Sequence, residues 1–350
     1  MLCWWMRLST VLCVAAALSV AGAVEAQEAK KWPVHKRLLG KDGEKSLDVS
    51  GIACTTDRGL PRHCLVIDDD LQAGQFVSVE EGELHAGDAV PLIDNFYDDK
   101  KLELDGEGVA YDDGAFYVIG SHGHPRHDDS DCDLAQPSAK NRAKIGAASQ
   151  VVRVGLKPSI GKTLSMHDVQ EITRTAKLRD FIAADQTLQP FLDKCLHRNG
   201  VTIEGIAILD GRLYAGFRGP SLPGRGAPIL SVPLTSLFGS GPNGARLTVV
   251  RVEDGRGVRD LARYKDGLLV LVGPTGDEAG QYDVYWWDGR SERMQHLGDI
   301  TGQTHAGKDS KPEGMLPLDE SGGKLRLLIL SDGDKAPEGE PRPVLVDAPR

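Results

Sequence analysis

The sequence has few aromatic residues and a deficit of positive charge. Phe, Trp and Tyr make up 5% of its 350 residues, and 41 Lys and Arg stand against 51 Asp and Glu, which leaves a net charge of −10. A protein that binds duplex nucleic acid or docks on an anionic membrane surface needs clustered cations. The charge balance therefore argues against both classes and favours a small-molecule ligand or a cationic partner, with no nucleic-acid partner.

Long apolar segments are also scarce. The longest run covers residues 8–20, follows Arg7 and precedes the small residues 21–26. It is too short for a comfortable membrane span and has the charge, length and small-residue end of a secretory signal peptide, residues 1–26. We predict cleavage after Ala26 and a periplasmic or secreted, monomeric protein without a membrane span, in which residues 27–350 form a single domain. An uncleaved anchor is the alternative.

Cysteine is sparse but even in number once the predicted signal peptide is removed. The four that remain are Cys54, Cys64, Cys132 and Cys195. An even number in an exported chain predicts disulfides, with three pairings available. We favour Cys54 with Cys64, on neighbouring strands of one hairpin, and Cys132 with Cys195, each in an irregular insertion. Four unpaired thiols are the alternative.

Glycine, in contrast, is abundant at 41 residues, and part of it belongs to a repeated five-residue motif. The five copies are residues 49–53 (VSGIA), 106–110 (GEGVA), 203–207 (IEGIA), 258–262 (VRDLA) and 312–316 (PEGML). An Asp-Gly pair follows three of them, at residues 113–114, 210–211 and 266–267. Asp-Gly between apolar runs is typical of a two-residue hairpin turn, because glycine accepts the positive φ that such turns require.

More short apolar strands follow each hairpin, so that each repeat has about four strands in total. Four-stranded units that recur in this way are the layout of a β-propeller, an all-β fold. The interval from Gly108 to Gly205 is 97 residues and includes a polar loop, residues 123–147, and a helical insertion, residues 176–196. We predict five blades, with six as the alternative, and expect residues 33–39 to add the outer strand of the last blade. A two-sheet sandwich predicts no repeated motif and ranks below.

Several longer segments resemble a known family. They are residues 117–122 (YVIGSH), 203–207, 211–220 (GRLYAGFRGP), 257–262 (GVRDLA), 312–314 and 327–334 (LLILSDGD). Taken in order, they resemble the bacterial domain of unknown function 3616 family. The resemblance implies a propeller fold and no characterised activity. The Glu-Gly openings are also similar to those of phytase-like and gluconolactonase-like propeller hydrolases, but the match ends there and carries over no catalytic residue.

Propeller geometry gathers polar residues at one mouth of the central channel. The first strand of each blade starts at the face to which the second strand returns. Residues that open the first strand (openings) and residues that end the second strand (returns) therefore converge at the same mouth. Openings contribute Asp105, Glu107, Glu204, Asp260 and Glu313; returns contribute Asp68, Asp69, Ser121, His122, Arg218, Thr275, Asp332 and Asp334. Carboxylates crowded in this way repel one another unless a cation or an arginine compensates their charge. We expect Arg218 and Arg259 to compensate part of the negative charge.

We therefore predict an acidic channel mouth that binds a small ligand with a divalent cation. Ca²⁺ suits oxygen ligands from several strands, and its predicted ligands are Glu107, Glu204, Asp260 and Glu313. The predicted ligand-binding residues are Glu107, Ser121, Arg259, Asp260 and Asp332, and the candidate catalytic residues are His122, Glu204 and Arg218. A bound cation would suit metal-assisted hydrolysis of an ester, phosphoester or lactone. The alternative is a non-catalytic envelope scaffold or protein-interaction module in which these carboxylates lock blade to blade.

Other catalytic motifs are missing. The sequence has no Gly-x-Ser-x-Gly elbow, which argues against a serine hydrolase, and no His-Glu-x-x-His helix or Gly-x-x-x-x-Gly-Lys-Ser/Thr phosphate loop. Residues 122–133 contain three histidines and four aspartates, but their spacing matches no defined zinc pattern. We interpret this segment as a solvated loop and leave His124 and His127 without a role.

Overall fold

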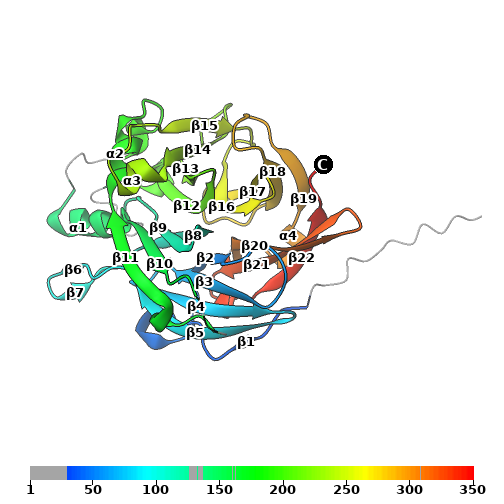
Figure 1. Cartoon of the computed structure of the whole chain (residues 1–350). Coiled ribbons are helices and arrows are strands. Elements are labelled where there is room, and N and C mark those ends of the chain that lie inside the picture. Colours follow the sequence, from blue (N-terminus) through cyan, green and yellow to red (C-terminus); the bar gives the residue numbers. More distant parts are fainter. Residues whose placement is uncertain (1–29, 126–131, 133–136, 160, 162, 308) are drawn as a thin grey trace, which may run out of the picture.

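The fold is a five-bladed β-propeller. The computed structural model describes residues 30–125, 132, 137–159, 161, 163–307 and 309–350, so the predicted signal peptide and His127 lie outside the described part. Five sheets surround one centre, with β2, β8, β12, β16 and β20 innermost (Figure 1). The prediction of five blades is confirmed, and the alternative of six is wrong.

Each blade is a meander of antiparallel strands. Blade 1 contains β2 (Val49–Cys54), β3 (Arg62–Asp68), β4 (Ala73–Glu80) and β5 (Glu83–Pro91), with β1 (Val34–His35) beside β5. Blade 2 contains β8 (Gly106–Asp112), β9 (Ala115–Gly120), β10 (Val151–Leu156) and β11 (Val169–Thr175). Blade 3 contains β12 (Thr202–Leu209), β13 (Arg212–Gly219), β14 (Ala227–Pro233) and β15 (Arg246–Val250).

The last two blades complete the ring. Blade 4 contains β16 (Arg256–Tyr264), β17 (Gly267–Pro274), β18 (Asp283–Trp287) and β19 (Gln295–Asp299). Blade 5 contains β20 (Lys311–Ser321), β21 (Lys324–Asp332) and β22 (Arg342–Asp347). A separate small hairpin, β6 (Phe96–Tyr97) with β7 (Lys100–Lys101), lies between blades 1 and 2 in the sequence.

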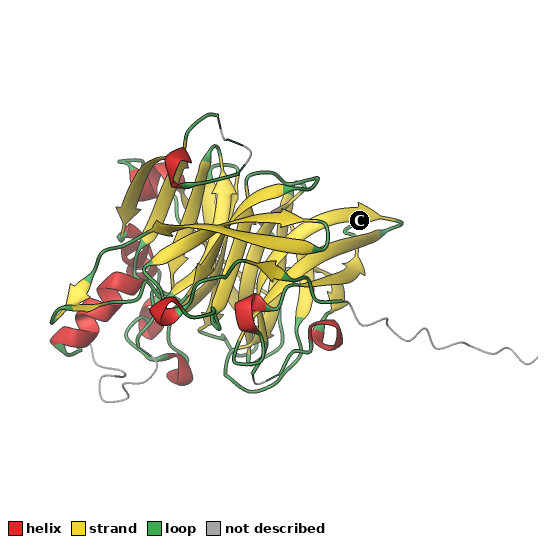
Figure 2. Cartoon of the chain, turned by 90° about the horizontal axis from the view of Figure 1, so that it is seen from below, coloured by secondary structure: helices red, strands yellow, loops and turns green. Residues whose placement is uncertain are grey.

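Helices lie outside the sheets (Figure 2). They are α1 (Ala139–Ala148), α2 (Lys177–Ala184), α3 (Leu234–Phe238) and α4 (Thr301–Thr304), with short 3₁₀ turns at Lys41–Gly43, Met166–Asp168, Gln189–Phe191, Leu196–Arg198 and Pro337–Gly339. The helical insertion over residues 176–196 is confirmed by α2 and the turn Gln189–Phe191. The loop expected over residues 123–147 instead contains most of α1. No helix in the described part of the chain is long and apolar enough to cross a membrane.

The hairpin turns follow from local chemistry. In blades 2 and 3 the central residues are Asp113-Gly114 and Asp210-Gly211, and all four have a positive φ. That is the conformation for which Asp-Gly is selected in two-residue hairpins. In blade 4 the turn lies one residue earlier than expected, because Tyr264 pairs with Gly267 and Gly267 already belongs to β17.

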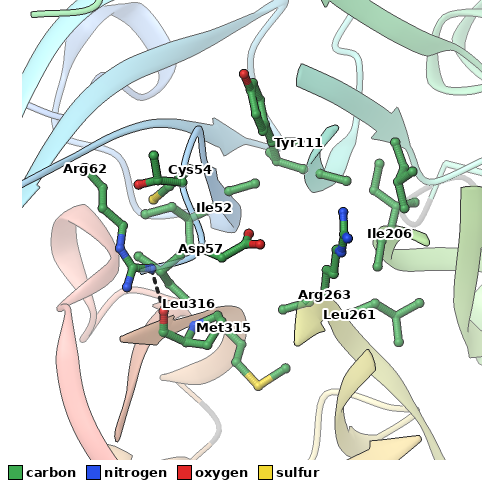
Figure 3. A pocket seen from close by; sticks show the side chains of 18 residues that line it. Ile52, Cys54, Asp57, Arg62, Tyr111, Ile206, Leu261, Arg263, Met315 and Leu316 are labelled. Carbon is green, nitrogen blue, oxygen red and sulfur yellow. Dashed lines mark hydrogen bonds between the residues drawn. The ribbon is translucent and has the colours of Figure 1, made fainter. Parts of the chain in front are cut away.

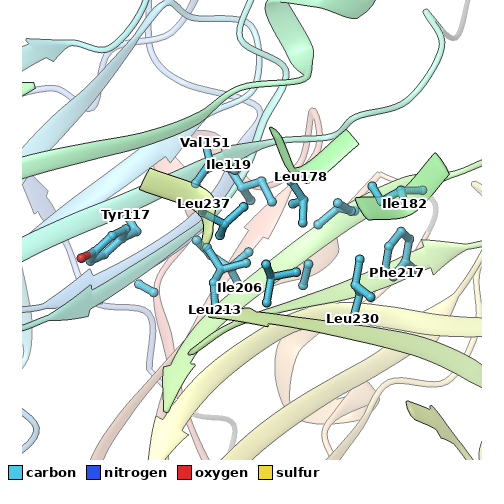
Figure 4. Close-up of a cluster of buried hydrophobic side chains, with 14 of the residues drawn as sticks. Tyr117, Ile119, Val151, Leu178, Ile182, Ile206, Leu213, Phe217, Leu230 and Leu237 are labelled. Atoms are coloured by element: carbon cyan, nitrogen blue, oxygen red, sulfur yellow. The ribbon is translucent and has the colours of Figure 1, made fainter. Parts of the chain in front are cut away.

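The core consists of five separate apolar clusters, one between each pair of neighbouring blades. Strand β9 shows how they form: Tyr117 and Ile119 pack toward blade 3, while Phe116 and Val118 pack toward blade 1. Successive side chains of a strand point to opposite faces, so a sheet buried on both faces needs a continuous apolar run. Between blades 2 and 3, α2 adds Leu178 to this packing (Figure 4).

The ring closes between blades 5 and 1 by packing rather than by a shared strand. Strand β1 pairs in parallel with β5 of blade 1, so the expectation that residues 33–39 complete the last blade is wrong. Leu38 and Val49 pack instead against apolar side chains of blade 5. The buried Arg62 donates 2.6 Å hydrogen bonds to the carbonyls of Pro317 and Leu318, which satisfies two backbone acceptors across the closure.

Candidate functional site

A β-bulge at the same motif position in every blade lines the channel with polar side chains. The strand register skips one residue in each inner strand, namely Ser50, Glu107, Glu204, Arg259 and Glu313. All five side chains are buried. A bulge leaves its extra residue unpaired and re-aims that side chain. The repeated motif therefore encodes a Ser-Glu-Glu-Arg-Glu set, which we call the axial ring.

Packing between neighbouring blades explains why glycine follows the bulge residue in the motif. A Cβ atom on Gly205 would lie 2.5 Å from the Cα of Asp260, and one on Gly108 would lie 2.9 Å from the amide nitrogen of Ile206. Real Cβ atoms do not approach backbone atoms so closely, so glycine allows the inner strands of neighbouring blades to meet. This close contact holds the axial ring rigidly at the centre of the fold.

Two arginines neutralise part of the axial ring. The guanidinium of Arg259 donates to the carboxylate of Glu313 and lies 3.4 Å from Oε2 of Glu204. Arg218, on β13, donates from Nη1 to Oε1 of Glu204 at 3.0 Å and from Nη2 to Asp277 at 3.0 Å. Oxygens of Glu107, Glu204 and Glu313 lie within 4.8 Å of one another. We call these three carboxylates the inner group. It brings together three of the four predicted metal ligands, and the guanidinium of Arg259 already lies beside two of them, Glu204 and Glu313.

Asp260, the fourth predicted metal ligand, does not join this group. It occupies the position that is glycine in the other four copies of the motif. Its Oδ1 accepts from the amide of Leu261 and its Oδ2 accepts from the amide of Met315, each at 2.7 Å. Burial raises the pKa of Asp260 well above its ordinary value, and these two hydrogen bonds oppose that rise. The side chain therefore links blade 4 to blade 5.

Above the axial ring, the mouth opens into a cavity of about 720 Å³. Of the residues predicted at this mouth, Asp69, Asp105, Asp332 and Asp334 line it. Among the described residues that line it are the carboxylates Asp48, Asp69, Asp70, Glu103, Asp105, Asp309, Asp332 and Asp334. The lysines Lys41, Lys101, Lys140, Lys144 and Lys311 line it as well. The described lining is acidic on balance, and it offers both anionic and cationic groups to a ligand.

Three carboxylates connect the cavity to the axial ring. One oxygen each of Asp69, Asp105 and Glu107 lies within 4.8 Å of the other two. Asp69 follows β3, Asp105 precedes β8, and Glu107 is the bulge residue of β8. The hydroxyl of Ser121, at the end of β9, donates to Asp105. Openings and returns thus converge in a cluster at the end of the cavity nearest the axial ring. We call this cluster of Asp69, Asp105 and Glu107 the outer group.

His122 is placed away from solvent. Its side chain is fully buried, its Nδ1 lies 2.9 Å from the carbonyl of Gly120, and its own carbonyl accepts a 2.9 Å hydrogen bond from Arg179. Burial lowers the pKa of His122 to about 4, so the ring is neutral at physiological pH. His122 is not among the residues that line the cavity, whereas His124, left without a role above, is one of them.

The opposite mouth is narrow and mostly apolar. A pocket of about 50 Å³ lies there, lined by all five inner strands, with Ile52, Ile206 and Leu261 among the lining side chains (Figure 3). Arg62, Asp57 and Arg263 surround it. The two ends of the channel therefore differ in kind, and polar chemistry is concentrated at the wide mouth.

The cavity lysines are the part of the site that sequence reasoning missed. Lys140 and Lys144 lie four residues apart on α1, which places them on one helix face, but this segment was interpreted as a loop. The N-cap of α1 was the available signal, because Ser138 precedes the helix and its hydroxyl accepts from the amide of Asn141. Lys41 lies in the 3₁₀ turn Lys41–Gly43, and Lys101 lies in β7 of the small hairpin.

One buried carboxyl group beside the cavity predicts a pH-dependent stability. Asp68 is 4% exposed; burial raises its pKa to about 7, although hydrogen bonds from Ser46 Oγ (2.5 Å) and the Asp70 amide (3.1 Å) lower it. The folded state thus holds a proton that the unfolded chain has released, and stability falls as pH rises from about 4 through about 7. Asp68→Asn should remove this dependence and exceed the wild-type free energy of unfolding by about 2–4 kcal/mol at pH 8, with little difference at pH 4.

Urea denaturation between pH 4 and pH 8 measures this difference. The exposed Asp94→Asn variant is the control and should follow the wild-type curve. Parallel curves for Asp68→Asn and the wild type over this range would show that Asp68 does not titrate as proposed.

The fold and the site define a five-bladed β-propeller with a charge-compensated axial ring beneath a polar cavity. The family model described as "Protein of unknown function (DUF3616)" matches residues 64–347. The chain belongs to this family, as the resemblance of its segments predicted. No curated protein matches the sequence.

Solved structures of similar shape include a hypothetical protein from Leishmania major (TM-score 0.41, 11% identity, 92% of this chain and 91% of that chain). An α-L-arabinofuranosidase from Podospora anserina has a TM-score of 0.41 and 8% identity, covering 92% of this chain and 98% of that chain. A Trypanosoma rangeli sialidase has a TM-score of 0.40 and 10% identity, covering 92% of this chain and 58% of that chain. We transfer no residue or activity from them.

Proposed function

We propose that the protein binds a small anionic ligand together with a divalent cation in the wide cavity. The observation that carries this proposal is the outer group, in which oxygens of Asp69, Asp105 and Glu107 converge within 4.8 Å at the inner end of that cavity. Carboxylate oxygens are the donors that Ca²⁺ prefers. Three of them supply half of the ligands of a Ca²⁺ ion and leave positions for water and for the bound molecule.

The outer group suits a cation better than the inner group does. Glu204 and Glu313 already have the guanidinium of Arg259 beside them, and a second cation there would meet like-charge repulsion. Asp69 and Asp105 instead line the cavity, where a cation can enter and a ligand can reach it. We assign Glu204, Arg218 and Arg259 to the charge balance of the axial ring, not to contact with the ligand.

The lysines indicate an anionic ligand. Lys140 and Lys144 from α1 and Lys311 from β20 line the same cavity. A phosphate or carboxylate group would be bound by the cation on one side and by ammonium groups on the other. Asp332 orients Lys311, since its carboxylate lies 3.4 Å from the Lys311 Nζ. A phosphoester matches both the cation and the ammonium groups, whereas an ester or a lactone matches the cation alone.

The reaction that this arrangement supports best is hydrolysis of the bound phosphoester. A bound cation lowers the pKa of coordinated water and polarises the phosphoryl group. The oxygen of the water attacks phosphorus, the bond from phosphorus to the alcohol oxygen breaks, and the proton released by the water passes to the departing alcohol. The cavity residues bind and orient the phosphate, and Ser121 holds Asp105 in place through its hydrogen bond.

We further propose that this chemistry takes place outside the cytoplasm. Both favoured cysteine pairs are disulfides, Cys54–Cys64 and Cys132–Cys195. Disulfides persist in oxidising compartments, which supports export by the predicted signal peptide.

Cation-dependent stability tests the cation site. Ca²⁺ at about 100 times its dissociation constant should add about 2.7 kcal/mol to the free energy of unfolding, and EDTA should remove that gain. The Asp69→Asn/Asp105→Asn variant should lose the response. Asp70→Asn is the matched control, because Asp70 lines the same cavity outside the outer group. A melting temperature that is indifferent to both Ca²⁺ and EDTA would refute the cation site.

A substrate panel then separates an enzyme from the scaffold alternative. Phosphate esters, aryl esters and lactones should be offered to the wild type, Asp70→Asn and the double variant in the presence of Ca²⁺. Turnover that depends on the outer group supports the hydrolase. Ca²⁺ binding with background rates for all three proteins would leave a cation-dependent binding module and exclude hydrolysis of these substrate classes.

A further inference from the structure

A second cluster of metal-ligating side chains lies on the outer edge of blade 1 and shares no residue with the outer group. His35 is the last residue of β1, and Glu83 and His85 lie two residues apart on β5. The parallel register pairs His35 with His85. Because residues two apart on a strand share a face, the three side chains project from the same face of the sheet.

The donor atoms converge on one point. The Nε2 of His35 lies 2.9 Å from one carboxylate oxygen of Glu83, and the Nε2 of His85 lies 3.0 Å from the other. The two imidazole rings stack with their centroids 4.7 Å apart and their planes 17° apart. Two imidazole nitrogens and one carboxylate oxygen thus lie within 4.8 Å of one another.

We propose that His35, Glu83 and His85 bind a divalent transition-metal ion, with Zn²⁺ as its best representative. Imidazole and carboxylate are zinc ligands at about 2.0–2.2 Å, and two such ligands of a tetrahedral ion are about 3.3 Å apart. The present separations of 2.9 and 3.0 Å need to open by only a few tenths of an ångström for an ion to replace the two hydrogen bonds. The partly exposed side chains leave the fourth position to water or another ligand.

The donor set separates this site from the outer group. Two of its three donors are nitrogens, which favour zinc and neighbouring transition metals, whereas the outer group offers oxygens alone and suits Ca²⁺. The two proposals are therefore independent, and failure of one does not affect the other.

The location of the ligands gives the ion a structural consequence. Strand β1 has two residues, and its register with β5 is short. His35 supplies one ligand from β1, while Glu83 and His85 supply two from β5. A bound ion therefore ties the N-terminal strand to blade 1, next to the point at which the ring closes.

Isothermal titration of the untagged, metal-free protein with ZnCl₂ tests the site. We expect one ion per chain with a dissociation constant in the micromolar range or below, and at least a tenfold weaker affinity for each of His35→Ala, His85→Ala and Glu83→Gln. Excess Ca²⁺ should not displace Zn²⁺. His296→Ala is the matched control, because His296 also pairs with a carboxylate, Asp283, but this pair offers only two metal-ligating groups. The variant should bind Zn²⁺ as the wild type does.

Hydrogen exchange provides the structural measurement. Zn²⁺ should slow exchange of the backbone amides of β1 in the wild type and in His296→Ala, and should leave them unchanged in His35→Ala. The melting temperatures of the metal-free variants should match the wild type, because these side chains are partly exposed. The proposal is wrong if the wild type does not bind Zn²⁺, or if its affinity is unchanged in all three ligand variants.

Discussion

Replacing Arg259 with methionine is expected to lower the free energy of unfolding by about 3–5 kcal/mol, the cost typical of removing one partner from a buried ion pair. The side chain is fully buried and its guanidinium compensates both Glu204 and Glu313. Without it, Glu204 keeps Arg218 at 3.0 Å. Glu313 keeps a 3.5 Å hydrogen bond from Ser50, so most of the penalty arises at Glu313.

Urea denaturation of three variants checks this assignment. Arg263→Met is the matched control, because Arg263 lies on the same strand, is 43% exposed and pairs with Asp112; it should cost no more than about 1 kcal/mol. Arg259→Met combined with Glu313→Gln should recover part of the loss, since the uncompensated charge is gone. A cost below about 1 kcal/mol for Arg259→Met alone would mean that the axial ring is not held by its charge balance.

Removing the Cys132–Cys195 disulfide is expected to cost more than removing Cys54–Cys64. The first closes a loop of 63 residues and the second a loop of 10. In the chain-entropy account these loops correspond to about 4 and about 3 kcal/mol. All four cysteines are buried, so replacement by alanine leaves comparable cavities and the paired variants are matched.

Denaturation of the two double-alanine variants, compared with the wild type, measures both costs. The Cys132–Cys195 bond also joins a residue that precedes α1 in the sequence to one that directly precedes the turn Leu196–Arg198. Its loss should therefore weaken ligand binding through Lys140 and Lys144 as well as stability, whereas the Cys54/Cys64 variant should retain the cavity. An equal or larger cost for the Cys54/Cys64 variant would contradict the loop-length argument.

The blade count was predictable because each blade is specified locally. The bulge motif and the Asp-Gly turns act over a few residues, and apolar runs buried on both faces recur with each copy. Cys54 and Cys64 belong to one hairpin, where the register pairs them directly, so their pairing followed from the same local logic.

The position of the site was predictable from the sequence, but the pairing of its carboxylates with arginines was not. The mouth on which openings and returns converge is where Asp69 and Asp105 lie. Which carboxylate meets an arginine depends on contacts between blades, such as Arg259 with Glu313, 54 residues apart. Asp260 looked equivalent to the glutamates, yet it occupies the glycine position and accepts two backbone amides.

The sequence by itself determined the repeating unit, the number of blades and the end of the channel where polar residues gather, because hairpin turns, bulges and strand alternation depend on neighbours in the chain. Tertiary structure decided the partner of β1, the contribution of α1 to the cavity and the division of the carboxylates into a compensated axial ring and an outer group. These depend on distances between residues from different blades, and Coulomb energy and burial are set by those distances rather than by sequence spacing.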